Sequence, residues 1–393
     1  MNPSAEDVPT DRTAGPTTPD GPLAGLADIE AWKARKKYPS TLFAGGPVFG
    51  SAHERPDGGW ELHPYVAGLA PQDARDALAA HLRGASRAAF DRGEDEAAAQ
   101  YLAAAERLDR EPLDELTVRG RRFRVIRAER FIRMGPDGPE PPRGTDPDDA
   151  RGRGGNGDPR AGQDPAAGLV IHPADTGHAA AAGVLRVELL TALRQKGTVP
   201  REVREDSRTA ARSHPGGVLL PATFMAAERE GGRWRPHSTG TAATPGDARD
   251  GLALHLRVMV PWQQDLSAAE HETYKRAADR LDEEQCDELD VAGRHFRIVR
   301  VERLIRVGPD GPEGPRPSDP DPVPPPLAPA AQRVDDDDPT PPEPDARTRK
   351  FMALFEEEHR RRTHSRRCAG PPRRGATPSR HGRRSGRSAA ARR

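Results

Sequence analysis

The sequence predicts an α+β protein in which one structural unit occurs twice. Residues 101–140 and 274–313 align without a gap at an offset of 173, and 26 of the 40 paired positions are identical. Within each copy, strand patterns lie at the two ends and helical patterns lie between them, which is typical of the α+β class. A repeat of this quality indicates two homologous tandem modules, each expected to be roughly ββααββ.

The repeat extends toward the N-terminus of each copy. DARDAL at 73–78 matches DARDGL at 247–252 at an offset of 174, and Trp60 matches Trp234 at the same offset. Phe49 and Phe224 match at an offset of 175. Each copy therefore spans roughly a hundred residues, which is the size of a domain with its own core.

The strands and helices of the first copy follow from local patterns. A helix is expected over 28–37 with Asp28 as its N-cap, followed by two strands, TLFAGGPVFGSAHER and GGWELHPYV, joined by a PDGG turn. A helix then begins near Pro71 and ends near Gly84, and a second helix covers 94–108. A turn at 119–120 separates the last two strands. Helices are also expected over 184–196, where leucines recur on one face, and over 347–362.

Composition separates segments that can fold from segments that cannot. Residues 28–140 and 169–313 contain 52 of the 61 Leu, Ile, Val and Phe residues. A segment that cannot bury apolar surface cannot offset the entropy cost of ordering its chain. The expected organisation is a disordered N-terminus (1–27), a first repeat (28–140), a flexible linker (141–168), an extra helical segment (169–200), a second repeat (201–313), Pro-rich acidic disorder (314–345), a short amphipathic helix (346–362) and an Arg-rich disordered tail (363–393).

The charge balance limits the classes of partner. The net charge is zero, but residues 359–393 contain 13 Arg and no acidic residue, so the rest of the chain is acidic. Only the tail could bind nucleic acid by charge, and without aromatic residues such binding would be nonspecific. The tail could also be inert, or result from out-of-frame translation of GC-rich DNA. No apolar stretch is long enough to cross a membrane, and two cysteines make no disulfide scaffold, so a cytoplasmic protein is expected.

Two sets of residues are candidates for a site. Histidines and acids recur as Asp76 with His81 and Asp250 with His255, but a five-residue spacing on a helix separates their side chains by about 140°, which disfavours a shared metal. An arginine run recurs at the same offset, and it could bind an anion or a partner, or form a solvated face paired with Glu129 and Asp114. The arginines in question are Arg124, Arg127, Arg130, Arg297, Arg300 and Arg303.

Several motifs together resemble one known family. YPSTLFAGGPVFG, ERPDGGW, DELTVRGRRFRVIR and GPDGPEPPR are similar to an uncharacterised actinobacterial family, domain of unknown function 5954, over 28–145 and more loosely over 214–321. The resemblance implies no activity, cofactor or catalytic residue. Signatures such as GxxxxGK[ST], GxSxG and CxxC are absent from the sequence.

The predicted function is a non-enzymatic interaction or regulatory adaptor whose two modules bind a protein or a small ligand, without a cofactor and without a membrane. Two alternatives remain open. One is a nucleic-acid-associated protein acting through the tail. The other is an enzyme with a site between the repeats.

Overall fold

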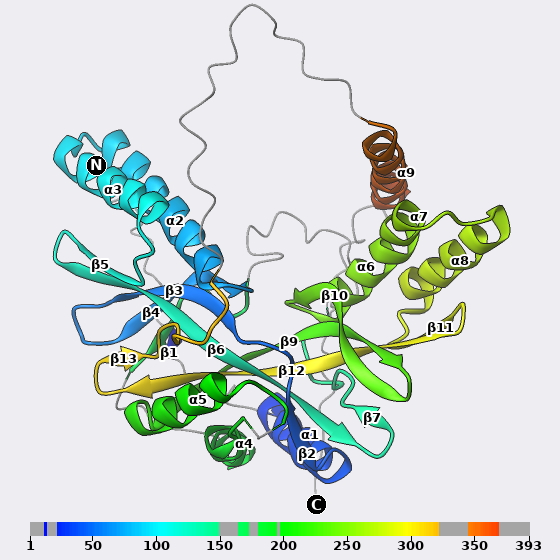
Figure 1. Ribbon diagram of the computed structural model, residues 1–393, viewed down its shortest axis with the longest axis horizontal. Coiled ribbons are helices and arrows are strands. Elements are labelled where there is room, and N and C mark those ends of the chain that lie inside the picture. The colour runs from blue at the N-terminus through cyan, green and yellow to red at the C-terminus, as the bar shows by residue number, and fades with distance from the viewer. Residues whose placement is uncertain are drawn as a thin grey trace, which may run out of the picture.

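A computed structural model of the protein shows a mixed helical and stranded fold, which confirms the predicted α+β composition (Figure 1). The structure describes residues 12–13, 22–148, 164–172, 180–194, 197–321 and 345–368. Most of the expected tail, the N-terminus and the centre of the expected linker lie outside the described residues. Within the described part of the chain, thirteen strands form one sheet, so both predicted hairpin regions share a sheet.

The first half contains three helices and six strands of this sheet. In chain order they are α1 (Pro22–Lys37), β2 (Ser40–Phe43), β3 (Val48–Glu54), β4 (Trp60–Gly68), α2 (Pro71–Asp91), α3 (Asp95–Arg110), β5 (Glu115–Val118), β6 (Arg121–Gly135) and β7 (Gly138–Pro139). β3 pairs antiparallel with β4, so the hairpin predicted at the PDGG turn is confirmed. β6 runs through the middle of the half and pairs with β2, β3 and β5.

The second half has a similar order of elements. They are α5 (Arg201–Ser213), β9 (Gly216–Glu230), β10 (Arg233–Ala242), α6 (Pro245–Leu254), the π-helix η1 (His255–Met259), α7 (Val260–Gln263), α8 (Ala268–Glu284), β11 (Glu288–Val291), β12 (Arg294–Gly308) and β13 (Gly311–Pro312). Four further elements flank the halves. These are β1 (Arg12–Thr13), β8 (Leu169–Ile171), α4 (Ala180–Thr191) and α9 (Ala346–Cys368).

Three boundaries differ from the predicted ones for local reasons. α1 begins at Pro22, where a proline suits a first helical turn, so Asp28 is not an N-cap; its carboxylate instead accepts a hydrogen bond from the amide of Ala181. The first predicted strand is interrupted at 44–47, where Gly45 has a φ of +75°. α2 continues past Gly84, because an exposed glycine costs a helix only about 1 kcal/mol and buried side chains continue beyond it to Ala89.

The two halves join through their longest strands. β6 and β12 pair antiparallel, and Arg130 lies opposite Arg303, its counterpart at the offset of 173. The two strands cross the centre of Figure 1, with α2 and α3 on one side and α6 and α8 on the other. One apolar cluster contains Trp60 and Ile126 from the first half together with Val218 and Ile305 from the second. The halves therefore share part of their core.

The prediction that 141–168 is a flexible linker is wrong at both described ends of this segment. At its start, Asp146 forms an ion pair with Arg300 at 3.0 Å, and Asp148 forms one with Arg249 at 2.5 Å. At its other end, Asp164 pairs with Arg303 at 2.8 Å. Glycine and proline content suggested a spacer, but the acidic side chains between them are partners for buried arginines. The described ends belong to the folded body.

α4 and α9 are the two helices expected outside the repeats. α4 buries Leu185 and Leu189 against Phe131 and Leu304, so it packs on strands of both halves. α9 begins at Ala346 and extends to Cys368, beyond the expected end at 362, and it packs against η1 and α7.

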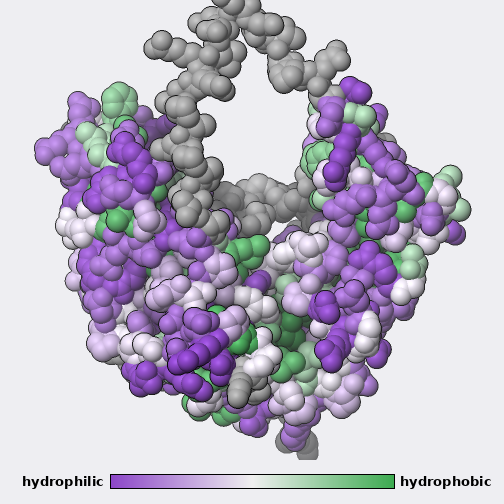
Figure 2. All heavy atoms as spheres, in the orientation of Figure 1, coloured by the Kyte–Doolittle hydropathy of each residue, from purple (hydrophilic) through white to green (hydrophobic). Residues whose placement is uncertain are grey.

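The visible face of the molecule is mainly hydrophilic, and hydrophobic residues show mostly near the middle of the view (Figure 2). Among the described residues, none of the helices is both long enough and apolar enough to cross a bilayer.

Candidate functional site

The arginine run connects the two halves instead of forming a solvated face. Arg127 is 2% exposed and Arg303 is 1% exposed, which contradicts the alternative of a solvated row of charges. The β6–β7 turn and the chain that follows it reach the second half, and the β12–β13 turn with its following chain reaches the first half. We call residues 136–148 and 309–321 the two arms.

Each arm turn packs on a tryptophan of the opposite half. Arg124 lies 4.7 Å from the ring centre of Trp60 and donates to the carbonyl of Pro312 at 3.2 Å. Its counterpart Arg297 lies 4.9 Å from the ring of Trp234 and donates to the carbonyl of Pro139 at 2.9 Å. These contacts join equivalent positions of the two copies, so the exchange of arms is reciprocal.

The turns require glycine at one position in each arm. Gly138 has a φ of +113° and Gly311 has a φ of +111°, values that side-chain-bearing residues rarely adopt. A Cβ atom at Gly138 would collide with the indole of Trp234, and one at Gly311 would collide with the indole of Trp60. The GPDG motif therefore lets each arm approach the opposite tryptophan closely.

Buried ion pairs continue along both arms. Arg127 pairs with Glu129 and with Asp319, both at 2.8 Å. Burial alone would raise the pKa of Glu129, but the charges of Arg127, Arg194 and Arg316 outweigh it and lower that pKa to about 2. In the other half, Arg300 pairs with Asp146 and with Glu302.

The central arginines differ in their partners. The terminal nitrogens Nη1 and Nη2 of Arg303 donate to the two carboxylate oxygens of Asp164, at 2.8 and 2.9 Å. Nη1 also donates to the carbonyl of Val66, and Nη2 to that of Pro221. Arg130 donates to the carbonyl of Gly46 at 3.0 Å, and the described residues contain no carboxylate that accepts from it. Burial, the largest cause, and the nearby charges of Arg194 and Arg303 lower the pKa of Arg130.

The histidines of the first half form a stacked cluster. The rings of His63 and His81 stack with their centres 4.0 Å apart, and the ring centre of His53 lies 5.3 Å from that of His63. His63 is buried and hydrogen-bonded to the hydroxyl of Ser51 at 2.9 Å and to His53 at 3.1 Å. Burial, followed by the charges of the other two histidines, lowers the pKa of His63 to about 2. The cluster is therefore neutral at physiological pH.

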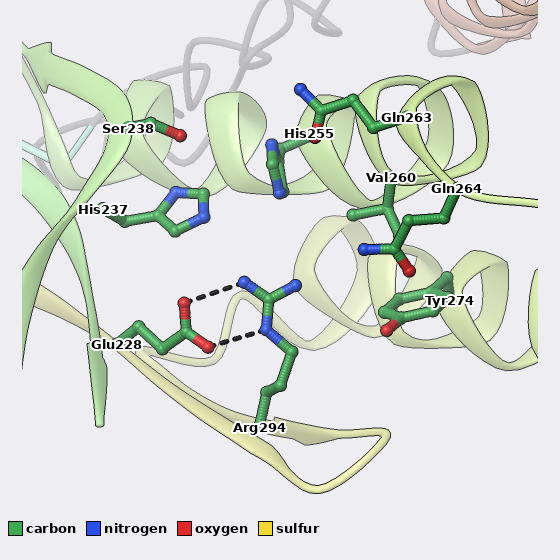
Figure 3. A pocket seen from close by; sticks show the side chains of 9 residues that line it. All are labelled: Glu228, His237, Ser238, His255, Val260, Gln263, Gln264, Tyr274 and Arg294. Atoms are coloured by element: carbon green, nitrogen blue, oxygen red, sulfur yellow. Dashed lines mark hydrogen bonds and ion pairs between the residues drawn. The ribbon is translucent and has the colours of Figure 1, made fainter. Parts of the chain in front are cut away.

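The equivalent positions of the second half line a pocket. Its volume is about 500 Å³. Figure 3 shows the side chains that line it. Its walls come from β9, β10, the η1–α7 segment, α8 and β12. The lining residues are Glu228, His237, Ser238, His255, Val260, Gln263, Gln264, Tyr274 and Arg294.

The two histidines of the pocket are oriented differently from the stacked pair. The ring centres of His237 and His255 are 4.4 Å apart, and the rings meet edge to face at 83°. Both residues are 9% exposed. Burial is the largest cause that lowers both pKa values, that of His255 to about 4. No other described group hydrogen-bonds to the ring nitrogens of His255, so a neutral imidazole points into the cavity with both nitrogens available (Figure 3).

A fixed ion pair forms the floor of the pocket in Figure 3. Arg294 donates through Nε and Nη2 to the two oxygens of Glu228, at 2.6 and 2.8 Å. The hydrogen bond to Arg294, the largest cause, holds the pKa of Glu228 below its usual range. In the first half, His53 occupies the position equivalent to Glu228, and Arg121 occupies that of Arg294.

A π-helix places His255 at the pocket wall. Pro261 has no amide hydrogen, and within an α-helix its ring would collide with the carbonyl of residue 257. The chain adopts π-helical geometry over His255–Met259, ending two residues before this proline of α7. In the first half, α2 has Arg87 at the corresponding position and remains an α-helix to Asp91. Short π-helical segments within helices frequently occur at functional sites. They shift the side chains that follow out of the regular α-helical register.

The predicted polar site is only partly assembled. His81 and His255 each lie in a histidine cluster, but the described contacts of Asp76 and Asp250 lie elsewhere. Asp76 accepts from Gln72 at 2.7 Å, and the backbone carbonyl of Asp250 accepts from Arg362 in α9. Within the described residues, no group of three or more potential ligands is arranged to hold a metal ion.

Sequence reasoning missed most of the pocket lining. Glu228, Arg294 and Tyr274 come from three elements whose packing no local pattern reveals. One signal was present: Pro261 interrupts a helical pattern shortly after a repeated histidine, and a proline inside a helix indicates a local distortion.

Comparison with known proteins identifies the family. A family model described as a family of unknown function, DUF5954, matches residues 21–322. The chain belongs to this family. The match covers both halves and both arms of this DUF5954 protein. No curated protein and no solved structure matches it.

Proposed function

We propose that this DUF5954 protein is a non-enzymatic ligand-binding protein made of two homologous ββααββ modules, and that the second module binds a small polar molecule. The modules hold each other through the reciprocal arms. Support for the two copies comes from contacts that recur at one offset: the amide of Arg127 donates to the carbonyl of Glu313, and the amide of Arg300 donates to that of Glu140.

The pocket of the second module carries the proposal. The ring nitrogens of His255 have no hydrogen-bond partner among the described residues, and they are not among the fully buried unpaired atoms, so they face the cavity where solvent reaches them. A ligand that replaces this solvent can bond to both nitrogens, and a hydrogen bond contributes about 0.5–1.5 kcal/mol net. A volume of about 500 Å³ lies within the range of roughly 300–1,000 Å³ that is usual for small-molecule sites.

The same geometry supports binding over catalysis. A general base at neutral pH needs a pKa near 7 and freedom to accept a proton. Glu228 is held in two hydrogen bonds to Arg294, and the pKa of His255 lies well below neutrality. In this proposal, binding of the ligand to the second module controls the adaptor role that the duplication predicts.

The experiment is a ligand screen on the full chain, read by the NMR signals of ¹⁵N-labelled histidine side chains. We expect a hit to shift the His255 signals and to lose affinity at least tenfold in His255→Ala. His359→Ala removes an exposed histidine on α9 and is the matched control that should bind normally. Hits that bind both variants equally would contradict a site at this pocket.

A further inference from the structure

The charge of the pocket is balanced before any ligand enters. Arg294 and Glu228 neutralise each other through two hydrogen bonds, and the two imidazoles are neutral near pH 7 because burial lowers their pKa values. An anionic ligand would meet the carboxylate of Glu228, and a cationic ligand would meet the guanidinium of Arg294. Burying an ion without a compensating charge is costly, so this lining favours an uncharged ligand.

The pocket wall mixes donors and acceptors at close spacing. A neutral imidazole offers one donor and one acceptor, and an amide side chain such as Gln263 or Gln264 offers both. The carboxylate of Glu228 can accept further hydrogen bonds, and Ser238 and Tyr274 contribute hydroxyl groups. A hydroxyl group on a ligand can donate to one such group and accept from another. Several hydroxyl groups would therefore satisfy this wall better than several groups of one kind.

The shape of the wall disfavours a flat aromatic ligand. Stacking requires parallel faces, whereas the rings of His237 and His255 are nearly perpendicular, at 83°. Val260 is the aliphatic residue of the lining, so a large apolar face would find little apolar surface to cover. Affinity here has to come mainly from hydrogen bonds.

From these three observations we infer that the pocket takes a small uncharged molecule rich in hydroxyl groups, of the size of a monosaccharide or a cyclic polyol. This inference rests on the proposed ligand-binding function and specifies its ligand class. His255 and Gln263 are the residues expected to contact the hydroxyl groups, with the Glu228–Arg294 pair beneath them.

The test compares neutral and charged probes of one shape on the full chain. The neutral probes are D-glucose, D-galactose and myo-inositol; the charged probes are D-glucuronate and D-glucosamine; adenine serves as the flat probe. Each is titrated while the ¹⁵N signals of the His237 and His255 rings are recorded, and the His255→Ala variant is read through His237. At least one neutral probe should bind at least tenfold more tightly than both charged probes and adenine. Its affinity should fall at least tenfold in His255→Ala and in Gln263→Ala, and should not change in His359→Ala.

The outcomes separate the two proposals. If glucuronate, glucosamine or adenine shifts the His255 signals at lower concentration than every neutral probe, the inferred ligand class is wrong and the ligand-binding function stands. If neither these probes nor the wider screen shifts those signals, both proposals fail. If His255→Ala is unfolded, Gln263→Ala still decides, because that glutamine is exposed at the pocket edge and its loss leaves the core intact.

Discussion

Replacing Arg303 by methionine should destabilise the protein much more than the same replacement at Arg130. The two arginines lie opposite each other where β6 and β12 pair, at equivalent positions of the two halves. Arg303 is 1% exposed and donates to both oxygens of Asp164, whereas Arg130 is 8% exposed and donates to one backbone carbonyl. The two substitutions therefore remove the same side chain at equivalent positions of equivalent strands. They differ in that only Arg303 has a carboxylate partner among the described residues.

The magnitudes follow from what each substitution leaves behind. Arg303→Met leaves the buried carboxylate of Asp164 uncompensated, which costs about 3–5 kcal/mol. Arg130→Met leaves the carbonyl of Gly46 without its donor, which costs about 1–3 kcal/mol. It also removes the repulsion from Arg194 and Arg303 that contributes to the lowered pKa of Arg130, and this offsets part of the loss. We therefore expect a difference of about 2 kcal/mol or more.

Guanidinium unfolding, followed by circular dichroism, measures both losses. With a slope of about 5 kcal/mol per molar, Arg303→Met should lower the midpoint by roughly 0.6–1 M, and Arg130→Met by less than about 0.5 M. Asp164→Asn should reproduce the Arg303→Met effect, and Arg201→Met, on an exposed pair, should leave the midpoint unchanged. Equal shifts for the two central arginines, or a larger shift for Arg130, would refute the reasoning that Asp164 anchors Arg303.

Three further outcomes are expected. Stability should fall as pH drops from about 6.5 toward 4, because the folded-state pKa of His63 is lowered while the unfolded chain takes up protons below 6.5; melting curves of His63→Phe should show a smaller fall over that window. Pro261→Ala should let η1 revert to α-helical geometry, which would rotate the pocket wall and weaken binding of any pocket ligand in a titration; unchanged affinity would count against the role of the π-turn. Glu358→Ala should release α9 and expose Trp262, which packs on Phe351 of α9, because the buried carboxylate of Glu358 pairs across to Arg257 of η1 at 3.6 Å; a red shift in tryptophan fluorescence with the main unfolding midpoint retained would show this.

The local elements were largely predictable because their signals are local. The hairpin at PDGG and the two helices that follow it rest on turn residues and on helical periodicity, and both occur in the structure. The end of α2 was not predictable from Gly84, since burial of Ala89 against α3 outweighs the small cost of an exposed glycine. The pairing of β6 with β12 could not be predicted either, because the local sequence of a strand does not show which strand 173 residues away it pairs with.

The packing of the arms could not be predicted from local composition either. Their proline, glycine and aspartate content is what a spacer has, and composition cannot reveal that Asp146 and Asp319 face buried arginines of the opposite half. The repeated arginines were visible in the sequence, but their partners were not. A buried arginine needs a carboxylate, and these carboxylates lie in segments that composition classified as a flexible linker (141–168) and as Pro-rich acidic disorder (314–345). The second prediction is also wrong over its described start, 314–321, where Asp319 pairs with Arg127 and Arg316 is buried.

Two substitutions explain why the equivalent positions of the halves differ. Where the first half has His53, the second has Glu228, which holds Arg294 at the pocket floor in place of a third stacked imidazole. Where the first half has Arg87 in a regular helix, the second has Pro261 beyond a π-turn. In the first half the three equivalent positions hold histidines whose rings contact one another, and in the second half they hold two histidines and the Glu228 that pairs with Arg294. If the proposed site binds a ligand, these two changed positions are the ones that distinguish its half from the other.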